Sequence, residues 1–572
     1  MDINNMQIFS EGHLPIVSGV YDQLKISEKI NEVVSWDKDK CNLSPGQAVK
    51  ALILNILSGY DPLYMISEFY KDKDVEKLIG KDINYTEINE FAMGRNLDKI
   101  YNSDAKKVYA HVVLTALKLE KIDVKAIHWD TTSKSFSGDY ERIIPEVQDD
   151  EKNPINITFG HSKDYRSDLR QMKFGIGTTK DKLPLFCDVL SGNEDDQKWN
   201  GNVIKRIEDE LSRVNLSDIL HVADSALVTS DNLKEIDDTT YKFISILPGT
   251  FNLEAKLIRK AIRKPEDWDD LGTLGSDEKR ASTYKIQSFK DVIGEKKYRF
   301  VVCHSSQLAE QNIKTVERYI EKEKTETKKA FDKAISKDGY FCEADAQKAI
   351  IKFQDKLKLK YHTLKYTMEE HEQIKKRSGV KGRRKKDEIP KTEKVYTFQY
   401  QLIENEEKIN QSKEETGMFV LITNKLNQEK LSNKELLIEY KDQNSVESTF
   451  KVLKSPSYVD SIFLNKPERI EAFSYIMVLA VLLMNLIERR IRENLKGESE
   501  EINLLGRRKT FLPTATAMFK VFEQVKVVAI PTELSIQRII PGGLDENQKR
   551  ILKLCGLSEE LYLGTFSKNK IV

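Results

Sequence analysis

The chain has 572 residues, 39% hydrophobic and 32% charged, so it can bury more than one core and should divide into several domains. Its 92 Lys and Arg residues and 91 Asp and Glu residues leave a net charge of only +1, so a nucleic-acid site must arise from local segregation of charge. Five scattered cysteines argue against a zinc site and a disulfide framework and favour a reducing cytoplasm, and no secretory signal is evident.

Residues 1–120 have a helical pattern and are predicted to form an N-terminal DNA-binding domain. Ser44 and Pro45 are typical of a helix start, and the turn 59–62 separates that helix from a second one at 63–80. Two helices joined by a tight turn can read DNA as a helix-turn-helix, although most such hairpins only pack together. The sequence leaves both readings open and does not tell which helix contacts bases.

Residues 121–245 are predicted to form the first part of an α/β core. The expected elements are a strand at 122–131 ending in Asp130, a polar turn at 133–138, a hairpin of strands at 169–178 and 183–192, a helix at 202–213, a strand ending in Asp224, and a strand at 241–247. This order is typical of an α/β fold. It places Asp130 and Asp224 at strand ends, where a sheet opens to solvent and ligands commonly bind.

Residues 246–430 are predicted to be an insertion into this core. It begins and ends with strand-like segments, and its middle reads as a long helix pair at about 307–376, broken near Asp338 and Gly339. The run KKRSGVKGRRKK at 375–386 then carries eight basic residues and no acid. We interpret it as a phosphate-contacting loop with salt-sensitive, sequence-independent binding, against the alternative of a solvated charge cluster. Its basic residues are Lys375, Lys376, Arg377, Lys381, Arg383, Arg384, Lys385 and Lys386.

Residues 431–495 are predicted to complete the core, and 496–572 form a tail without a predicted structure. On one helix, six side chains would lie on or near one side: Tyr440, Gln443, Glu447, Phe450, Lys451 and Lys454. The carboxylate of Glu447 could then bind a hard cation while the lysines approach phosphate. The apolar run 472–487 is shorter than the about 20 residues that span a bilayer, so we expect a buried helix.

Asp130, Asp224 and Glu447, if brought together, could hold two divalent cations. Two Mg²⁺ ions about 4 Å apart activate a water or a DNA 3′-hydroxyl and stabilise the leaving oxygen, the two-metal route to phosphodiester cleavage and transfer. His128 lies on the same strand face as Asp130, and a structural role suits it better than metal binding.

At this point the chain resembles the DDE transposases of bacterial insertion sequences, in the group with a ribonuclease H-like core and a β-rich insertion before the last carboxylate. The matching segments, in order, are HWDTTSKSFSG, GHSKDYRSDLRQ at 160–171, SGNEDD at 191–196, HVADSAL, GMFVLITN at 417–424, and the run from Tyr440 that continues into KSPSYVDSIFLNKPERIEAF. Each is weak alone, but together they span about 120–495. The family pattern around its last acid is matched by Tyr440, Glu447 and Lys454, whereas Gln443 stands where Arg is usual, which implies a weaker DNA contact.

The resemblance implies a transposase that binds the terminal inverted repeats of its element, cleaves the strands and joins them to target DNA. Its catalytic and metal-binding residues would be Asp130, Asp224 and Glu447, with Mg²⁺ as cofactor and Mn²⁺ as a substitute. Its partners would be double-stranded DNA and a second copy of the chain, without a membrane, in the bacterial cytoplasm and at the nucleoid when DNA is bound. The alternatives are a related nuclease that cleaves without joining, and a non-enzymatic DNA-binding or assembly protein.

Overall fold

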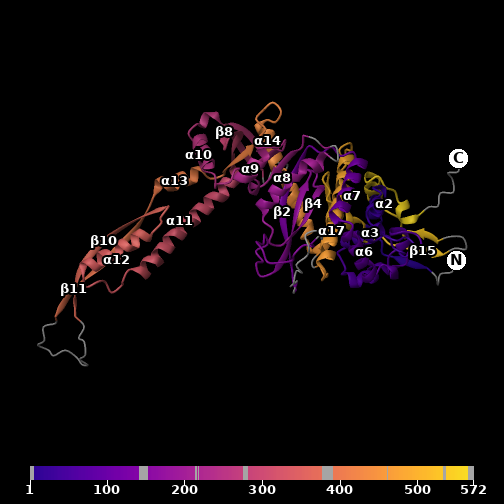
Figure 1. Ribbon diagram of the computed structural model, residues 1–572, viewed down its shortest axis with the longest axis horizontal. Coiled ribbons are helices and arrows are strands. Elements are labelled where there is room, and N and C mark those ends of the chain that lie inside the picture. Colours follow the sequence, from indigo (N-terminus) through magenta and orange to yellow (C-terminus); the bar gives the residue numbers. More distant parts are fainter. Residues whose placement is uncertain are drawn as a thin grey trace, which may run out of the picture. The chain divides into compact units, whose positions relative to one another are not determined.

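The structure is a computed structural model. It describes residues 6–138, 140, 153–212, 216, 218–274, 281–375, 391–459, 462–531 and 536–564. The chain forms two compact units (Figure 1). The first unit contains Met1–Ser245, Thr423–Lys425 and Glu435–Val572, and the second contains Ile246–Ile422 and Leu426–Lys434. Both mix helices with strands, and strands of the large sheet run both parallel and antiparallel, so the α/β class predicted from the sequence is confirmed.

The N-terminal part of the first unit is helical, as predicted. Its main helices are α1 (Leu14–Gln23), α2 (Ile26–Val33), α3 (Pro45–Ile56), α6 (Glu90–Asn102) and α7 (Ala105–Leu119). The predicted start of α3 is confirmed: Ser44 caps it, accepting a hydrogen bond from the Gln47 amide, and the Gln47 side chain accepts one from Ser44.

The second helix predicted in this part is wrong, because its residues form three short pieces. These are η2 (Leu63–Met65), α4 (Ile66–Tyr70) and α5 (Val75–Leu78). The break has a local cause, since the buried Asp74 caps α5 by accepting a hydrogen bond from the Lys77 amide. All of α3 except Gln47 is buried, so among the described residues α3 packs as a core helix and offers no face for reading DNA.

The strands of the first unit lie in the order β4-β3-β2-β5-β6. They are β2 (Ala126–Phe136), β3 (Arg170–Thr178), β4 (Pro184–Ser191), β5 (Leu220–Ala223) and β6 (Lys242–Ile246). β3 runs antiparallel to β2 and β4, whereas β2, β5 and β6 run parallel. Helix α8 (Asp196–Ser212) begins six residues earlier than predicted, where the Asp195 side chain accepts hydrogen bonds from the Gln197 and Lys198 amides (2.9 and 3.0 Å).

Strand β2 continues beyond Asp130, where the sequence predicted a strand end and a polar turn. It stays paired with β3 from His128 opposite Thr178 to Phe136 opposite Arg170. Most polar side chains of this stretch are buried rather than looped out, and Ser133 and Lys134 have hydrogen-bond partners. Lys134, 6% exposed, donates hydrogen bonds to the carbonyls of Leu453 (3.2 Å) and Val459 (2.8 Å).

Helix α17 (Pro467–Leu495) is the central helix of the first unit. By length and composition it could cross a membrane, but the whole of its most apolar window is buried inside the protein. It contacts α1, α3, α6, α7 and β4. The residues after 495, left without a predicted structure, include α18 (Ala515–Phe522) and α19 (Glu546–Leu554), which pack on α17. A small sheet pairs β1 (Gln7–Phe9) with β15 (Val527–Pro531), and β15 with β16 (Ile536–Ile539).

The second unit begins with a helix rather than with the predicted strands, whereas the strand predicted near its end is present. It contains α10 (Asn252–Ile262), β7 (Asp269–Leu274), β8 (Ser282–Ile293), β9 (Lys296–Ser305), α11 (Ser306–Ala334), α12 (Glu343–Lys356), β10 (His362–Ile374), β11 (Thr392–Glu404), α13 (Glu406–Glu414) and β12 (Met418–Thr423). The helix break near Gly339 is confirmed, and Gly339 has the positive φ of 78° that glycine accepts most easily.

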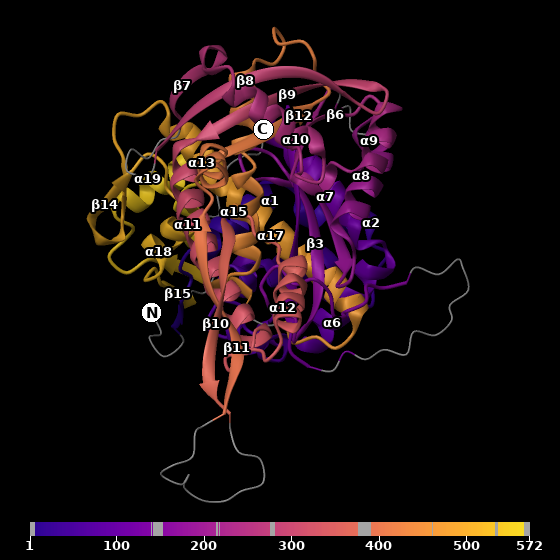
Figure 2. The ribbon, with the colours of Figure 1, turned by 90° about the vertical axis from the view of Figure 1, so that its left-hand side faces the viewer.

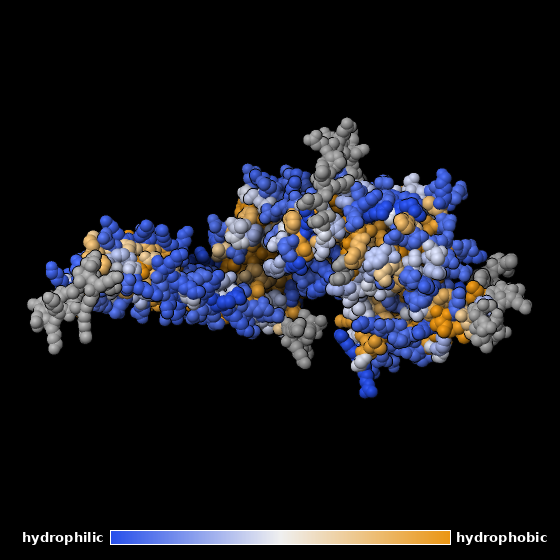
Figure 3. Space-filling view, turned by 90° about the horizontal axis from the view of Figure 1, so that it is seen from below, coloured by the Kyte–Doolittle hydropathy of each residue, from blue (hydrophilic) through white to orange (hydrophobic). Residues whose placement is uncertain are grey.

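The predicted helix pair does not extend to residue 376, because residues 362–374 form strand β10, paired antiparallel with β11. The stretch HTLKYTM alternates between the two sides of a strand, and its apolar members pack on the helices. Phe331, Ile350 and Phe353 of α11 and α12 contact Leu364 and Tyr400 of the hairpin. Figure 2 shows the hairpin beside both helices, and in Figure 3 the surface of this part is mostly hydrophilic.

Candidate active site

Asp130 and Asp224 lie next to each other because of the register between two parallel strands. The pairing of β2 with β5 ends with Trp129 opposite Ala223, and the two aspartates are the next residues on each strand. Asp224 follows β5 directly, as predicted, and its side chain accepts a hydrogen bond from the Ala226 amide at 3.0 Å. Neighbouring strands are about 4.8 Å apart, so both carboxylates stand at one place on the sheet.

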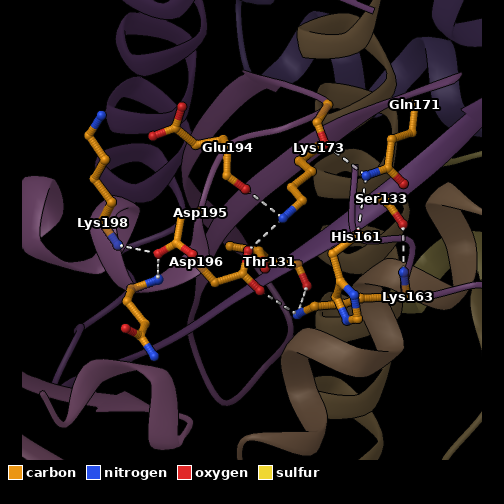
Figure 4. Close-up of polar contacts among 12 residues, drawn as sticks. Thr131, Ser133, His161, Lys163, Gln171, Lys173, Glu194, Asp195, Asp196 and Lys198 are labelled. Carbon is orange, nitrogen blue, oxygen red and sulfur yellow. Dashed lines mark hydrogen bonds and ion pairs between the residues drawn. The ribbon is translucent and has the colours of Figure 1, made fainter. Parts of the chain in front are cut away.

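The ammonium of Lys163 lies among these carboxylates. Its Nζ donates hydrogen bonds to Asp130 Oδ1 (3.0 Å) and to the Thr131 carbonyl (2.7 Å). It also lies 3.5 Å from Oδ2 of Asp196, the first residue of α8. Figure 4 shows Lys163, Thr131 and Asp196 converging. We call Asp130, Asp196, Asp224 and Lys163 the acidic cluster.

Lys173 completes the surroundings of Asp196. This lysine of β3 is buried, and its Nζ donates to Asp196 Oδ1 (3.0 Å) and to the Glu194 carbonyl (2.7 Å) (Figure 4). Asp196 is therefore held between two ammonium groups. Sequence reasoning missed Lys163 and Asp196 as site residues, although both lie in segments that carried the family resemblance, KDYRSD and SGNEDD.

The charges of the cluster shift the pKa values of its members. Burial, together with the negative charge of Asp130, raises the pKa of Asp224 above its usual value, although Lys163 opposes the shift. Burial alone would also raise the pKa of Asp196, but the hydrogen bond from Lys173 and the charge of Lys163 lower it. Burial would lower the pKa of Lys163, but Asp130 and Asp196 outweigh burial and raise it. The effect is mutual for Asp196 and Asp224: the acids favour the charged form of Lys163, and Lys163 favours the ionised forms of these two carboxyls.

Glu447 lies on helix α15 (Asn444–Leu453), which packs along β2 and β3. At one end of this contact, the Ser445 and Thr178 hydroxyls are 3.0 Å apart, at the level of His128 on β2. At the other end, Lys134 holds the Leu453 carbonyl. Asp130 lies between these levels, so α15 passes the acidic cluster. Glu447 itself is exposed and stands in the first turn of the helix.

The single helix predicted for residues 440–454 is wrong. Helix α14 (Asn433–Lys441) ends before Asp442, and the chain turns before α15 begins. The turn is tight because the Ser445 amide bonds the Asp442 carbonyl and the Val446 amide bonds the Gln443 carbonyl, each three residues back. Tyr440 therefore does not share a helix face with Glu447, and Phe450, 8% exposed, packs inward.

The four residues of this segment that were predicted to contact DNA differ in how exposed they are. Gln443 and Tyr440 are half-buried, Lys451 is exposed, and Lys454 forms an ion pair with Asp164 at 2.7 Å. Nearby, Arg166 donates two hydrogen bonds of 2.9 Å to Asp168. Arg166 and Asp168 are therefore paired with each other.

The basic run 375–386 connects β10 to β11, and not a helix to a strand as the sequence predicted. Only Lys375 lies within the described residues, where it stands 3.8 Å from Glu393. Lys376, Arg377, Lys381, Arg383, Arg384, Lys385 and Lys386 lie outside them, so their predicted role in binding DNA stays a prediction.

The residue types of the acidic cluster suit a hard divalent cation, which prefers carboxylate oxygens. The spacing of these side chains, in contrast, does not form a ready metal site. Among the described residues, no three His, Cys, Asp or Glu side chains are arranged to hold a metal ion. The cation that Asp130 and Asp196 share is the ammonium of Lys163. His128, fully buried and 3.3 Å from Glu439, is placed in the core as expected.

Residues 4–114 match a family described as a domain of unknown function, DUF4277. A search of curated proteins finds no match. Among solved structures, the chain is similar to a cryo-EM structure of the piggyBac transposase synaptic complex with hairpin DNA, with a TM-score of 0.38 and 7% identity over 89% of this chain and 79% of that chain. A TM-score this low does not establish a common fold.

Proposed function

We propose that the protein is a DDE transposase that binds the terminal inverted repeats of a bacterial insertion sequence, cleaves the DNA strands and joins them to target DNA. One observation carries this proposal: Asp130 and Asp224 stand side by side on the parallel strands β2 and β5. Burial and, after it, the charge of Asp130 raise the pKa of Asp224, so the ionised pair is costly and favours a cation.

The strand order supports a ribonuclease H-like core for the first unit, as the family resemblance implies. Three antiparallel strands, β4, β3 and β2, are followed by β5 and β6, which run parallel to β2. Asp130 comes from the central strand of this group and Asp224 from its parallel neighbour. Asp224 follows the carboxyl end of β5, where ligands commonly bind, and Asp130 stands beside it on β2.

Asp130, Asp224 and Glu447 would hold the cofactor, which we expect to be two Mg²⁺ ions, with Mn²⁺ as a substitute. The bound ions would supply the Lewis acid that activates the attacking hydroxyl and stabilises the leaving oxygen. Glu447 would turn its exposed carboxylate toward Asp130, beside which α15 passes. Tyr440, Gln443, Lys451 and Lys454 would bind the DNA backbone, with Lys454 leaving Asp164 for a phosphate.

The remaining expectations belong to the same proposal. Element ends and target DNA would be the substrates, and a homodimer would bridge two ends in the DNA complex. The basic run 375–386 would add phosphate contacts of no sequence preference. The reaction would take place in the bacterial cytoplasm, with the protein at the nucleoid while it holds DNA.

The test uses labelled DNA from the regions that flank the coding sequence, incubated with protein, Mg²⁺ and a target plasmid. We expect joined product from the wild-type protein and none from Asp130→Asn or Asp224→Asn, with DNA binding retained in both. Asp231→Asn, an exposed aspartate in the first turn of α9 (Ser230–Asp237), is the matched control and should join normally. Cleavage without joining would identify a nuclease, and neither product would favour an assembly protein.

A further inference from the structure

The Lys163 ammonium has more oxygen partners than a lysine on the open surface would have. It has three oxygen partners, on Asp130, Thr131 and Asp196, at 3.0, 2.7 and 3.5 Å. The charge of Asp224 also acts on it. The ammonium therefore makes two hydrogen bonds and one ion pair within the site.

The segment that carries Lys163 is fixed on both sides. The Lys163 amide donates to the Ser133 hydroxyl on β2 at 3.2 Å. The next residue, Asp164, is tied to Lys454 at the end of α15. The Tyr165 amide closes a turn by donating to the Ser162 carbonyl. The position of the ammonium is therefore set by the fold rather than by a freely moving side chain.

Among the described residues, no three metal-ligating side chains are arranged to hold an ion, although the residue types suit one. Lys163 lies between two of the acids. Its Nζ binds Asp130 Oδ1, an oxygen that a divalent cation would also need, and it reaches Asp196 on the other side. A single positive charge between the acids lowers their repulsion and so weakens the drive to bind a further cation.

We propose that Lys163 is an internal counter-cation that competes with the divalent cation for Asp130, and that Asp196 belongs to the same cation site. This proposal rests on the proposed function, because it concerns the carboxylates assigned to catalysis. Lys163 is thus a positioning residue: it keeps the acids together and raises the concentration of free metal needed to load them. Lys163 would release Asp130 when these carboxylates bind a divalent cation.

The experiment measures Mn²⁺ binding to the DNA-free full-length chain, by titration with the electron paramagnetic resonance signal of free Mn²⁺. We expect Lys163→Gln and Lys163→Met to bind Mn²⁺ at least about tenfold more tightly than the wild type, since each removes a unit charge next to the site. Lys163→Arg keeps the charge and should bind as weakly as the wild type. Adding Asp196→Asn to Lys163→Gln should reverse most of the gain.

The matched control is Lys198→Gln, which removes an equal charge from α8. The Lys198 side chain is exposed and extends away from Lys163 (Figure 4), so Mn²⁺ affinity should not change. Equal or weaker Mn²⁺ binding by both uncharged Lys163 variants would overturn the proposal, and so would tight binding by Lys163→Arg. The readout needs no DNA and no joining. If the Mn²⁺ prediction fails but the wild-type protein joins DNA, the proposed function still stands. If the wild-type protein does not join DNA, the Mn²⁺ measurement still tests the role of Lys163.

Discussion

Replacing Lys134 with Met should loosen the attachment of α15 to the sheet. The ammonium of this buried lysine holds the Leu453 and Val459 carbonyls at 3.2 and 2.8 Å. Hydrogen bonds to a charged donor contribute about 1.5 to 3 kcal/mol each. Met fills a similar volume, and its burial avoids the cost of burying an ammonium, which offsets part of the loss. We expect a net loss of about 2 kcal/mol in the free energy of unfolding of the first unit.

Urea denaturation followed by tryptophan fluorescence measures this loss. Trp36, Trp129 and Trp199 lie in the first unit, so their signal reports mainly its unfolding. Lys125→Met is the control, because the Lys125 side chain is 86% exposed and its loss should change stability by less than about 0.5 kcal/mol. DNA joining should fall by about 100-fold in Lys134→Met, since a shift of about 1 Å can cost that much. Wild-type stability and joining in Lys134→Met would refute the reasoning.

Three further predictions concern other parts of the chain. Burial raises the pKa of Glu11 from 4.5 to about 7, so the folded state binds an extra proton between these values and loses stability as the pH rises through them. In urea denaturation at several pH values, Glu11→Gln should lose less of its free energy of unfolding as the pH rises, and at pH 8 it should be more stable than the wild type by at most about 3 kcal/mol. A pH dependence of stability equal to that of the wild type would contradict this prediction. Replacing Arg383, Arg384, Lys385 and Lys386 with Ala should make DNA affinity less sensitive to salt. In fluorescence anisotropy, the slope of log affinity against log salt concentration should fall by up to about 0.9 for each lost phosphate contact. An unchanged slope would show that these residues do not contact phosphate. Gln443→Arg should strengthen binding of element-end DNA about three- to tenfold in the same assay, because Arg adds a charged donor, and weaker binding would place Gln443 away from the DNA.

The sequence predicted the elements best where local chemistry decides them. Ser44 and Pro45 marked the start of α3, and the hairpin of β3 and β4 followed from two apolar runs around a short turn. Prediction failed where distant partners decide. The polar end of β2 stays a strand because Lys134 finds carbonyls more than 300 residues away, which no local pattern reveals.

The candidate site shows the same division. Asp130 and Asp224 could be predicted as neighbours, because each follows a buried run and parallel strands bring such positions together. Lys163 and Asp196 could not, since their roles depend on a loop and a helix start folding onto that place. The break between α14 and α15 was also missed, because helix periodicity continues through the two residues of the tight turn.

The most direct test of the central claim is DNA joining by Glu447→Gln, because the claim requires Glu447 to act together with Asp130 and Asp224. Glu546→Gln is the matched control, since Glu546 is also an exposed glutamate in the first turn of a helix in the same unit. We predict that Glu447→Gln binds element-end DNA like the wild type and forms no joined product, while Glu546→Gln joins normally. Normal joining by Glu447→Gln would contradict the assignment.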